Sequence, residues 1–336
     1  AYESQSPLNI TGGGTKPFLG HRTETTQVLD VTGHTGIVEY DPAELVLVAR
    51  AGTPMKDIEA LLETHQQILG FEPPFTRHGA TLGGVVAAGL AGPRRAYSGA
   101  VRDFILGADF VNGRGEVITT GGKVMKNVAG FDLFRPMAGA MGTLGVLLNV
   151  SLRVIPKPET EQTLILEEGD ELTALQTMNA LAIKTQALSA SAWDGSHIRI
   201  RLSGASASVA HALTLTDGEK PEDGSFWHDL NNLELDFFHK KGRLWRISVA
   251  PMSQPLGEGL DLLLDWGGAQ RWLKSDESPD SIRTRARQLG GHAECYSQDQ
   301  TVSTYHPPEK SSMALHRRFK TALDPAGILN PGKLCF

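Results

Sequence analysis

Residues 7–16 read PLNITGGGTK, an apolar strand followed at once by three glycines. Because glycine has no Cβ, the amides of Gly12, Gly13 and Gly14 can approach an anion closely, and consecutive N–H groups form a concave nest for phosphate. A triple glycine taken alone is more often a flexible turn than a ligand cradle. Its spacing also differs from the Gly-x-Gly-x-x-Gly pattern of a Rossmann nucleotide-binding loop.

Two later segments are also rich in glycine. The stretch 83–92 is small and apolar, which is typical of a helix pressed against another backbone or a flat ligand. The order and combination of the three segments predict one long phosphate-bearing ligand that lies across several loops. The residues concerned in the later segments are Thr81, Leu82, Gly83, Gly84, Ser98, Gly99, Gly142, Gly145 and Val146.

Length and composition indicate an ordinary globular protein. With 336 residues and 40% apolar composition, the chain can bury a sizeable core and is expected to form two domains. No stretch approaches the roughly 20 consecutive apolar residues that cross a bilayer, and no targeting pattern begins the chain. The chain starts at Ala1, without a methionine and only a few residues before a strand, which predicts that natural N-terminal residues precede it.

The charged residues argue against one class of partner. Residues 1–158 carry 14 Lys or Arg and 14 Asp or Glu, so this part is neutral. The remaining residues carry 18 Lys or Arg and 24 Asp or Glu, which places the net charge of −6 in the second half. Nucleic-acid binding needs a clustered basic field with interleaved aromatic residues, and the sequence shows none. We therefore do not expect nucleic acid as a partner.

Metal-binding patterns are also missing from the sequence. Cys295 and Cys335 form no Cys-x-x-Cys pair, so cysteines of this chain cannot hold a zinc ion or an iron–sulfur cluster. This usage fits a reducing compartment. The eleven histidines include no His-x-His or His-x-x-x-His pair, so no metal is indicated, although ligands gathered from distant segments stay open.

The first region reads as short strands with one clear hairpin. Apolar alternation predicts strands at 36–40, 45–49 and 146–154, and a hairpin formed by 104–111 and 116–120. Between them, Ile58, Leu61 and Leu62 follow helical spacing after Thr53, a suitable N-cap, and Pro54, a suitable first helical residue. That helix is expected to pack in the core.

A domain boundary is expected near residue 158, where prolines end the last strand and the composition turns polar and acidic. Beyond it, strands at 244–249 and 260–264 and a helix from Ser278 to Gly290 indicate an α+β unit. The glycine-rich stretch 265–272 fits either a loop over a ligand or a packed turn.

The tail reads as an amphipathic helix over 311–323, followed by two proline turns. Because such turns fix the chain path, the tail is expected to dock against another element. It ends in the sequence Asn330-Pro331-Gly332-Lys333.

With these motifs the chain resembles the vanillyl-alcohol-oxidase, or PCMH-type, family of FAD-binding proteins. Within that family it is similar to the FAD-binding E subunits of bacterial glycolate oxidases. The residues that carry the resemblance are the loop 12–15, the segments 81–84 and 142–146, the tail 324–333, and the signatures 91–95, 101–104, 124–133, 244–248 and 265–268.

The resemblance implies an α+β fold: a PCMH-type FAD-binding domain of two α+β subdomains over 1–158, an α+β cap domain over 159–310, and a C-terminal segment, 311–336, that returns to the FAD domain. FAD is expected to be non-covalent, because the first loop lacks the histidine through which some members tether the flavin. From the residues themselves, Arg94 or Arg95 would neutralise the pyrophosphate or bind an acidic partner, unless the two are a solvated pair at a helix end. The implied FAD-binding residues are Gly12, Gly13, Gly14, Thr15, Lys16, Thr81, Leu82, Gly83, Gly84, Arg94, Ser98, Gly99, Gly142, Gly145, Val146 and Asn330.

The sequence also departs from related 2-hydroxyacid dehydrogenases of this fold, including the larger D subunit. They carry Gly-Asp-Gly-Asn-x-His and Glu-His-Gly stretches that supply metal ligands and a base, and here His292-Ala293-Glu294 is the nearest approximation. Without an assembled base, oxidation of glycolate by this chain alone is not expected, and no catalytic residue is assigned.

The resemblance therefore implies an FAD subunit of a cytoplasmic, multi-subunit glycolate oxidase, which makes glyoxylate and works beside a catalytic D subunit and an iron–sulfur subunit. Attachment at the inner membrane through those partners stays open. The alternatives are a self-contained FAD-dependent 2-hydroxyacid oxidase and a largely structural flavoprotein subunit. A nicotinamide dehydrogenase is disfavoured because the glycines around Gly142 lack the strand–Gly-x-Gly-x-x-Gly–helix context.

Overall fold

The computed structural model describes residues 1–21, 23, 25, 27–122, 132–220, 224–257, 259–296 and 301–334. Most of the 124–133 signature and Cys335 lie outside these residues. The chain divides into two compact units. The first unit comprises Ala1–Ala91, Gly99–Lys157 and Pro307–Phe336, and the second comprises Gly92–Ser98 and Pro158–His306.

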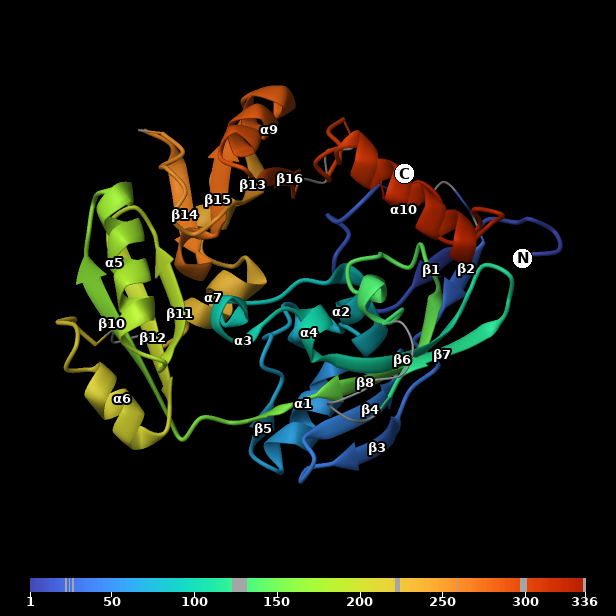
Figure 1. Ribbon diagram of the computed structural model, residues 1–336, viewed down its shortest axis with the longest axis horizontal. Helices are drawn as coiled ribbons and strands as arrows, with labels where there is room; N and C mark the ends of the chain where they lie inside the picture. Colours follow the sequence, from blue (N-terminus) through green and yellow to red (C-terminus); the bar gives the residue numbers. More distant parts are fainter. Residues whose placement is uncertain are drawn as a thin grey trace. The chain divides into compact units, whose positions relative to one another are not determined.

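The first unit is built on a five-stranded antiparallel sheet with the order β3-β4-β8-β6-β7 (Figure 1). The expected strands and the expected hairpin are confirmed within one or two residues. The strands are β3 (Ile37–Asp41), β4 (Val46–Arg50), β6 (Ile105–Val111), β7 (Val117–Gly121) and β8 (Val146–Arg153).

Strand β8 is more buried than its sequence alternation predicts. It lies between β4 and β6, and Val150 and Leu152 are fully buried. Ser151, on the face expected to be polar and open, is only 9% exposed. Of the polar side chains on that face, Ser151 is buried, whereas Asn149 and Arg153 are half-buried.

Shorter elements surround this sheet. Strands β1 and β2 form a parallel two-stranded sheet, and strands β5 and β9 form an antiparallel two-stranded sheet. The strands are β1 (Asn9–Thr11), β2 (Val28–Asp30), β5 (Gln67–Ile68) and β9 (Ile155–Pro156). The helices are α1 (Met55–Glu63), α2 (Leu82–Ala88), α4 (Val101–Phe104) and α10 (Lys310–Leu323), with 3-10 turns η1 (Thr76–His78) and η2 (Arg135–Met137).

Helix α1 confirms the expected helix but begins one residue later than its sequence suggests. Its N-cap is Pro54, and no side chain caps it. The Thr53 hydroxyl accepts a hydrogen bond from the amide of Gly36 over 2.9 Å and lies 3.2 Å from the Gly36 carbonyl, to which it donates. Met55, Ile58 and Leu62 are buried in the core of the unit.

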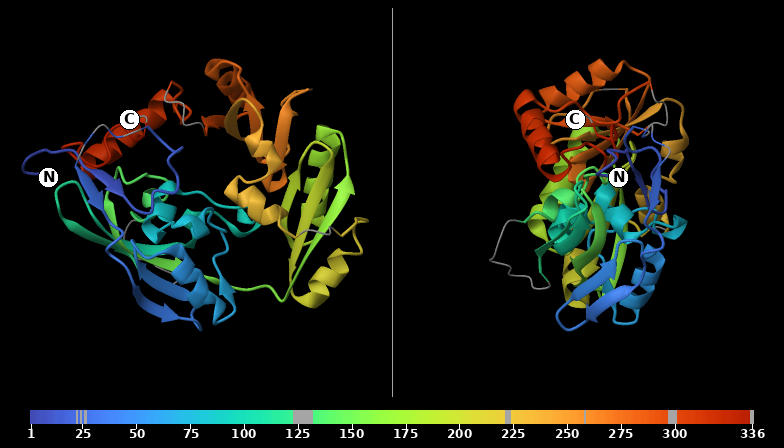
Figure 2. Two further views of the ribbon diagram at one scale, coloured as in Figure 1. Left: turned by 180° about the vertical axis from the view of Figure 1, so that it is seen from behind. Right: turned by 90° about the vertical axis from the view of Figure 1, so that its right-hand side faces the viewer.

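The C-terminal segment docks on the N-terminal strand of the same unit, as expected from its proline turns. Leu8 pairs with Leu329 in a parallel bridge, and Ile328 and Leu329 share an apolar cluster with Val146. In the left view of Figure 2, the C-terminal segment, in red, meets the N-terminal segment, in blue. The Lys320 ammonium donates hydrogen bonds to Asp324 and to the carbonyls of Thr143 and Leu329.

The second unit holds a seven-stranded antiparallel sheet with the order β10-β12-β11-β14-β15-β13-β16. Helices α5, α6 and α9 share one apolar core with Ile198, Ile200 and Leu202, which alternate along β12 and so face one side. The strands are β10 (Thr160–Glu167), β11 (Leu188–Trp193), β12 (His197–Gly204), β13 (Arg243–Ser248), β14 (Asp261–Asp265), β15 (Gln270–Ser275) and β16 (His292–Cys295). The helices are α3 (Arg95–Ser98), α5 (Glu171–Lys184), α6 (Ser206–Ala212), α7 (Phe226–Asn232), α8 (Asp236–His239) and α9 (Pro279–Gln288), with the 3-10 turn η3 (Trp266–Gly268).

The glycine-rich stretch in this unit is a packed turn, one of the two structures its sequence fits. Element η3 joins β14 to β15, and Trp266 is only 4% exposed. Its indole N–H donates to the carbonyl of Gly92, and the Arg95 guanidinium lies 4.2 Å from its ring centroid. The glycines allow the positive φ angles of 65° at Gly267 and 92° at Gly268 that this turn requires.

Candidate cofactor-binding site

A cavity of about 300 Å³ in the first unit brings the three glycine-rich segments together. Strand β1 delivers the first loop, α2 the second segment, and the turn before β8 the third. The predicted residues that line the cavity are Gly12, Gly13, Gly14, Thr15, Lys16, Thr81, Gly83, Gly84, Gly142, Gly145, Val146 and Asn330.

Glycine is required here by close backbone packing. A Cβ on Gly13 would lie 1.9 Å from the carbonyl oxygen of Gly79, and one on Gly12 would lie 2.5 Å from Oγ1 of Thr81. The Thr81 hydroxyl already caps α2 by accepting a hydrogen bond from the amide of Gly84. Any side chain at these positions would push the loops apart, so the glycines keep the wall of the cavity thin.

Asn330 fixes two of the loops to each other. Its Oδ1 accepts a hydrogen bond from the amide of Ile10, and its Nδ2 donates to the carbonyl of Met141 over 2.6 Å. A Cβ on Gly142 would lie 2.7 Å from this Nδ2. The tail therefore forms part of the cavity wall and holds the strand before the first loop to the turn before Gly142.

The cavity is electrostatically positive. Lys16 and Lys333 are its only charged lining residues among those described. Burial lowers the pKa of Lys16 to about 8 and also lowers the pKa of Lys333. Lys16 Nζ donates to Oγ1 of Thr15 over 3.0 Å and lies 5.6 Å from the ring centroid of Phe75.

Four predicted residues do not line this cavity. Leu82 is fully buried in the apolar core, and Gly99 precedes α4. Ser98 and Arg94 belong to the second unit, where the Ser98 hydroxyl donates to the carbonyl of Arg94. The Arg94 guanidinium donates to Oγ of Ser203 over 2.7 Å and to Oε2 of Glu161 over 2.8 Å.

Other lining residues were missing from the predicted set. Most are small or apolar, so their sequence signal cannot be distinguished from core packing. Lys333 could have been predicted from the sequence as a cavity residue, because it ends the Asn330-Pro331-Gly332-Lys333 motif. The additional lining residues are Asn9, Ile10, Thr11, Pro17, Val31, Ala51, Ala87, Ala88, Met137, Ala140, Met141, Leu147 and Lys333.

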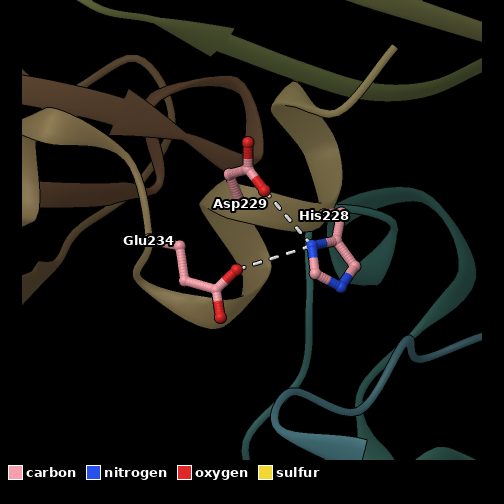
Figure 3. Close-up of side chains that lie close together, drawn as sticks. All are labelled: His228, Asp229 and Glu234. Atoms are coloured by element: carbon pink, nitrogen blue, oxygen red, sulfur yellow. Dashed lines mark hydrogen bonds and ion pairs between the residues drawn. The ribbon is translucent and has the colours of Figure 1, made fainter. Parts of the chain in front are cut away.

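A second polar group lies in the second unit, at α7 (Figure 3). The Nδ1 atom of His228 lies 3.2 Å from Oδ1 of Asp229 and 3.6 Å from Oε2 of Glu234. The Ser225 hydroxyl donates to the other oxygen of Asp229 over 2.6 Å. The hydrogen bond between the imidazole and Asp229 on this part-exposed surface accounts for the grouping.

The segment nearest to the base motif of related enzymes is strand β16. Glu294 lies 3.3 Å from the Arg246 guanidinium, and the backbone amide of Ala293 donates to Nδ1 of His306. Arg246 also donates to the hydroxyl of Tyr296. These groups are engaged within the sheet of the second unit.

In the described part of the chain, no helix is long and apolar enough to span a bilayer.

Comparison with known families defines the class of protein. Residues 1–121 match the FAD binding domain, and residues 298–334 match the C-terminal domain of FAD linked oxidases. The structure resembles that of p-cresol methylhydroxylase with a TM-score of 0.70 and 16% identity, covering 99% of this chain and 84% of that chain. The PCMH-type α+β fold expected from the sequence is thereby confirmed, and the protein is an FAD-dependent oxidoreductase.

Individual relatives narrow the class. The chain is 44% identical over 340 residues to the glycolate oxidase subunit GlcE of Escherichia coli (strain K12), covering 99% of this chain and 94% of that protein. It belongs to the GlcE family of FAD-linked oxidase subunits. It is also 33% identical over 185 residues to the glycolate oxidase subunit GlcD of Bacillus subtilis (strain 168), covering 54% of this chain and 39% of that protein.

The lining of the cavity fits FAD. The thin glycine walls would admit a diphosphate to the backbone amides, and the two lysines match its negative charge. Apolar residues such as Met137, Ala140 and Leu147 complete the lining and suit flat rings. No histidine, cysteine or tyrosine lines the cavity among the described residues.

Proposed function

We propose that the chain is the FAD-binding subunit of a multi-subunit glycolate oxidase, which oxidises glycolate to glyoxylate. The observation that carries the proposal is the cavity in which the loop 12–16, the segments 81–84 and 142–146, and the tail meet around two lysines. The chain is 44% identical, over nearly its whole length, to a glycolate oxidase subunit, and this similarity supports glycolate as the substrate. We further propose that the predicted lining residues bind FAD without a covalent link.

Oxidation of a 2-hydroxy acid removes a proton from the hydroxyl and a hydride equivalent from the carbon, and bound FAD supplies the acceptor for the hydride. The protein must also supply a base. No histidine or carboxylate lines the cavity among the described residues. This supports a division of labour in which a GlcD-type partner provides the base.

We also propose that electrons leave through an iron–sulfur partner subunit. Cys295 is buried in the second unit, and the sequence offers only one further cysteine, so this chain lacks the cysteines for a cluster of its own. The proposal describes a cytoplasmic subunit whose attachment to a membrane, where it occurs, is made by its partners.

Anaerobic reconstitution tests the proposal. The purified chain is loaded with FAD, and its visible spectrum is followed after glycolate is added, first alone and then with the GlcD-type and iron–sulfur subunits. We expect FAD to bind, the isolated chain to stay oxidised, and the complex to reduce an electron acceptor. Bleaching of the isolated chain at the rate of the complex would favour a self-contained 2-hydroxyacid oxidase, and failure to bind FAD would overturn the proposal.

A further inference from the structure

The two lysines of the cavity have an unusual setting for cations. Lys16 and Lys333 face the same cavity, and no carboxylate among the described residues lines it. Lys16 Nζ donates a hydrogen bond to the Thr15 hydroxyl and lies 5.6 Å from the ring centroid of Phe75. Without an anion, two cations that share a partly desolvated cavity lack the charge that would stabilise them.

Burial of the Lys16 side chain disfavours its charged ammonium form. Its pKa is lowered to about 8, and no charged residue in the described chain contributes to that shift. The pKa of Lys333 is lowered for the same reason. In the cofactor-free protein, Lys16 is therefore half neutral at about pH 8, which is rare for a lysine side chain.

We propose that Lys16 takes up a proton when the FAD diphosphate enters the cavity, so that cofactor binding and protonation of this lysine are linked. This inference rests on the proposed function, because it concerns the same cavity and the same ligand. Lys333 supplies the second positive charge. At and above about pH 8, Lys16 is thus fully cationic only when the cofactor is bound.

The direction of the pH effect follows from linkage. A nearby diphosphate stabilises the ammonium form, so the pKa of Lys16 is higher in the complex than in the free protein. The complex then holds more protons between the two pKa values, and FAD affinity falls as the pH rises through that range. Below the free-protein pKa of about 8, Lys16 is already charged and the affinity is level.

Titration calorimetry with FAD measures the proton directly. The full chain is stripped of cofactor and titrated in buffers of different ionisation enthalpy, and the slope of the observed heat against that enthalpy gives the protons taken up. We expect uptake of about half a proton at pH 8 and almost none at about pH 6.5. The dissociation constant is expected to be about tenfold weaker at pH 9 than at pH 7.

Two variants assign the proton to this residue. Lys16→Arg carries a permanent charge, so it should bind FAD with little pH dependence and without the uptake at pH 8. Lys157→Arg makes the same change at an exposed residue outside the cavity, paired with Glu63, and should behave as the wild type. Thermal unfolding of both variants confirms that they are folded.

The outcomes separate the inference from the proposed function. If the wild type binds FAD at about pH 6.5 but shows no uptake at pH 8, the linkage is wrong and the cofactor assignment stands. Equal uptake in Lys16→Arg would assign the proton to another group and overturn the inference. If the wild type does not bind FAD at any pH, the proposed function itself fails.

Discussion

The side-chain oxygen of Asn330 accepts a 2.7 Å hydrogen bond from the backbone amide of Ile10, although the two residues are 320 positions apart in sequence. The amide nitrogen of the same side chain donates to Met141. Asn330 adopts a left-handed conformation with a φ of 44°, which asparagine tolerates better than most residues. One side chain thus joins the tail, the strand before the first glycine loop and the turn before Gly142.

Replacement of Asn330 by alanine should loosen the cofactor cavity. It leaves the amide of Ile10 and the carbonyl of Met141 without these partners, and each unsatisfied buried group costs about 1–3 kcal/mol. We expect a lower midpoint of thermal unfolding and weaker FAD binding, measured by calorimetry and by quenching of flavin fluorescence. Asn330→Asp keeps the acceptor for Ile10 but sets a carboxylate oxygen against the carbonyl of Met141 and adds negative charge to the cavity, so it should bind FAD at least as weakly as Asn330→Ala. Unchanged FAD affinity in Asn330→Ala would show that the tail does not shape the cavity.

A methyl group at Gly13 should be incompatible with the first loop. Its Cβ would lie 1.9 Å from the Gly79 carbonyl, which is backbone and cannot rotate away. We expect Gly13→Ala to bind FAD at least tenfold more weakly, a loss of about 1.4 kcal/mol or more. Gly33→Ala is the matched control, because a Cβ there meets nothing within 4 Å, and it should change stability by no more than about 0.5 kcal/mol. Similar FAD affinities in the two variants would contradict the close packing.

The ion pair of Lys320 and Asp324 should stabilise the docked tail. The Asp324 side chain is fully buried and also accepts hydrogen bonds from the amides of Ile328 and Leu329. Lys320→Met leaves this carboxylate without its cation, which typically costs about 3–5 kcal/mol, and chemical denaturation should show the loss. Arg318→Met, on the exposed side of the same helix, should have little effect. Equal stability of the two variants would rule out a structural role for the pair.

Arg94 offers a test between two roles. The structure pairs its guanidinium with Glu161 and Ser203 inside the second unit, whereas the sequence suggested a pyrophosphate contact. We expect Arg94→Met to lower stability by about 1–3 kcal/mol, the value of hydrogen bonds to a charged group, and to leave FAD affinity within about twofold. Thermal unfolding and FAD titration of the same preparation decide between the roles. Arg102→Met, at an exposed arginine, serves as the control. Weaker FAD binding at unchanged stability would instead support the pyrophosphate contact.

The site was predictable where the signal was local. Glycines that must let backbones approach are marked in the sequence itself, so the sequence alone predicts that the segments of Gly12, Thr81 and Gly142 share one ligand, and the three residues line one cavity. The strands and the hairpin were predictable for the same reason, because their side chains alternate along a few residues.

The rest of the site depends on long-range partners. Arg94 sits beside glycines in sequence, but its described partners are 67 and 109 positions away, where no local pattern points to them. Thr53 is a residue type that often caps a helix, but here its hydroxyl accepts a hydrogen bond from the amide of Gly36 and does not cap α1. Met137 and Ala140 line the cavity with side chains that are equally common in any core.

The cavity uses residues that lie more than 300 positions apart in the sequence, from Asn9 to Lys333, and this bears on its biogenesis. Asn330 and Lys333 complete a wall that begins at Asn9. A nascent chain still attached to the ribosome exposes the glycine loops long before these residues emerge. On the proposed function, the flavin can therefore be taken up only after the chain has been synthesised as far as Lys333.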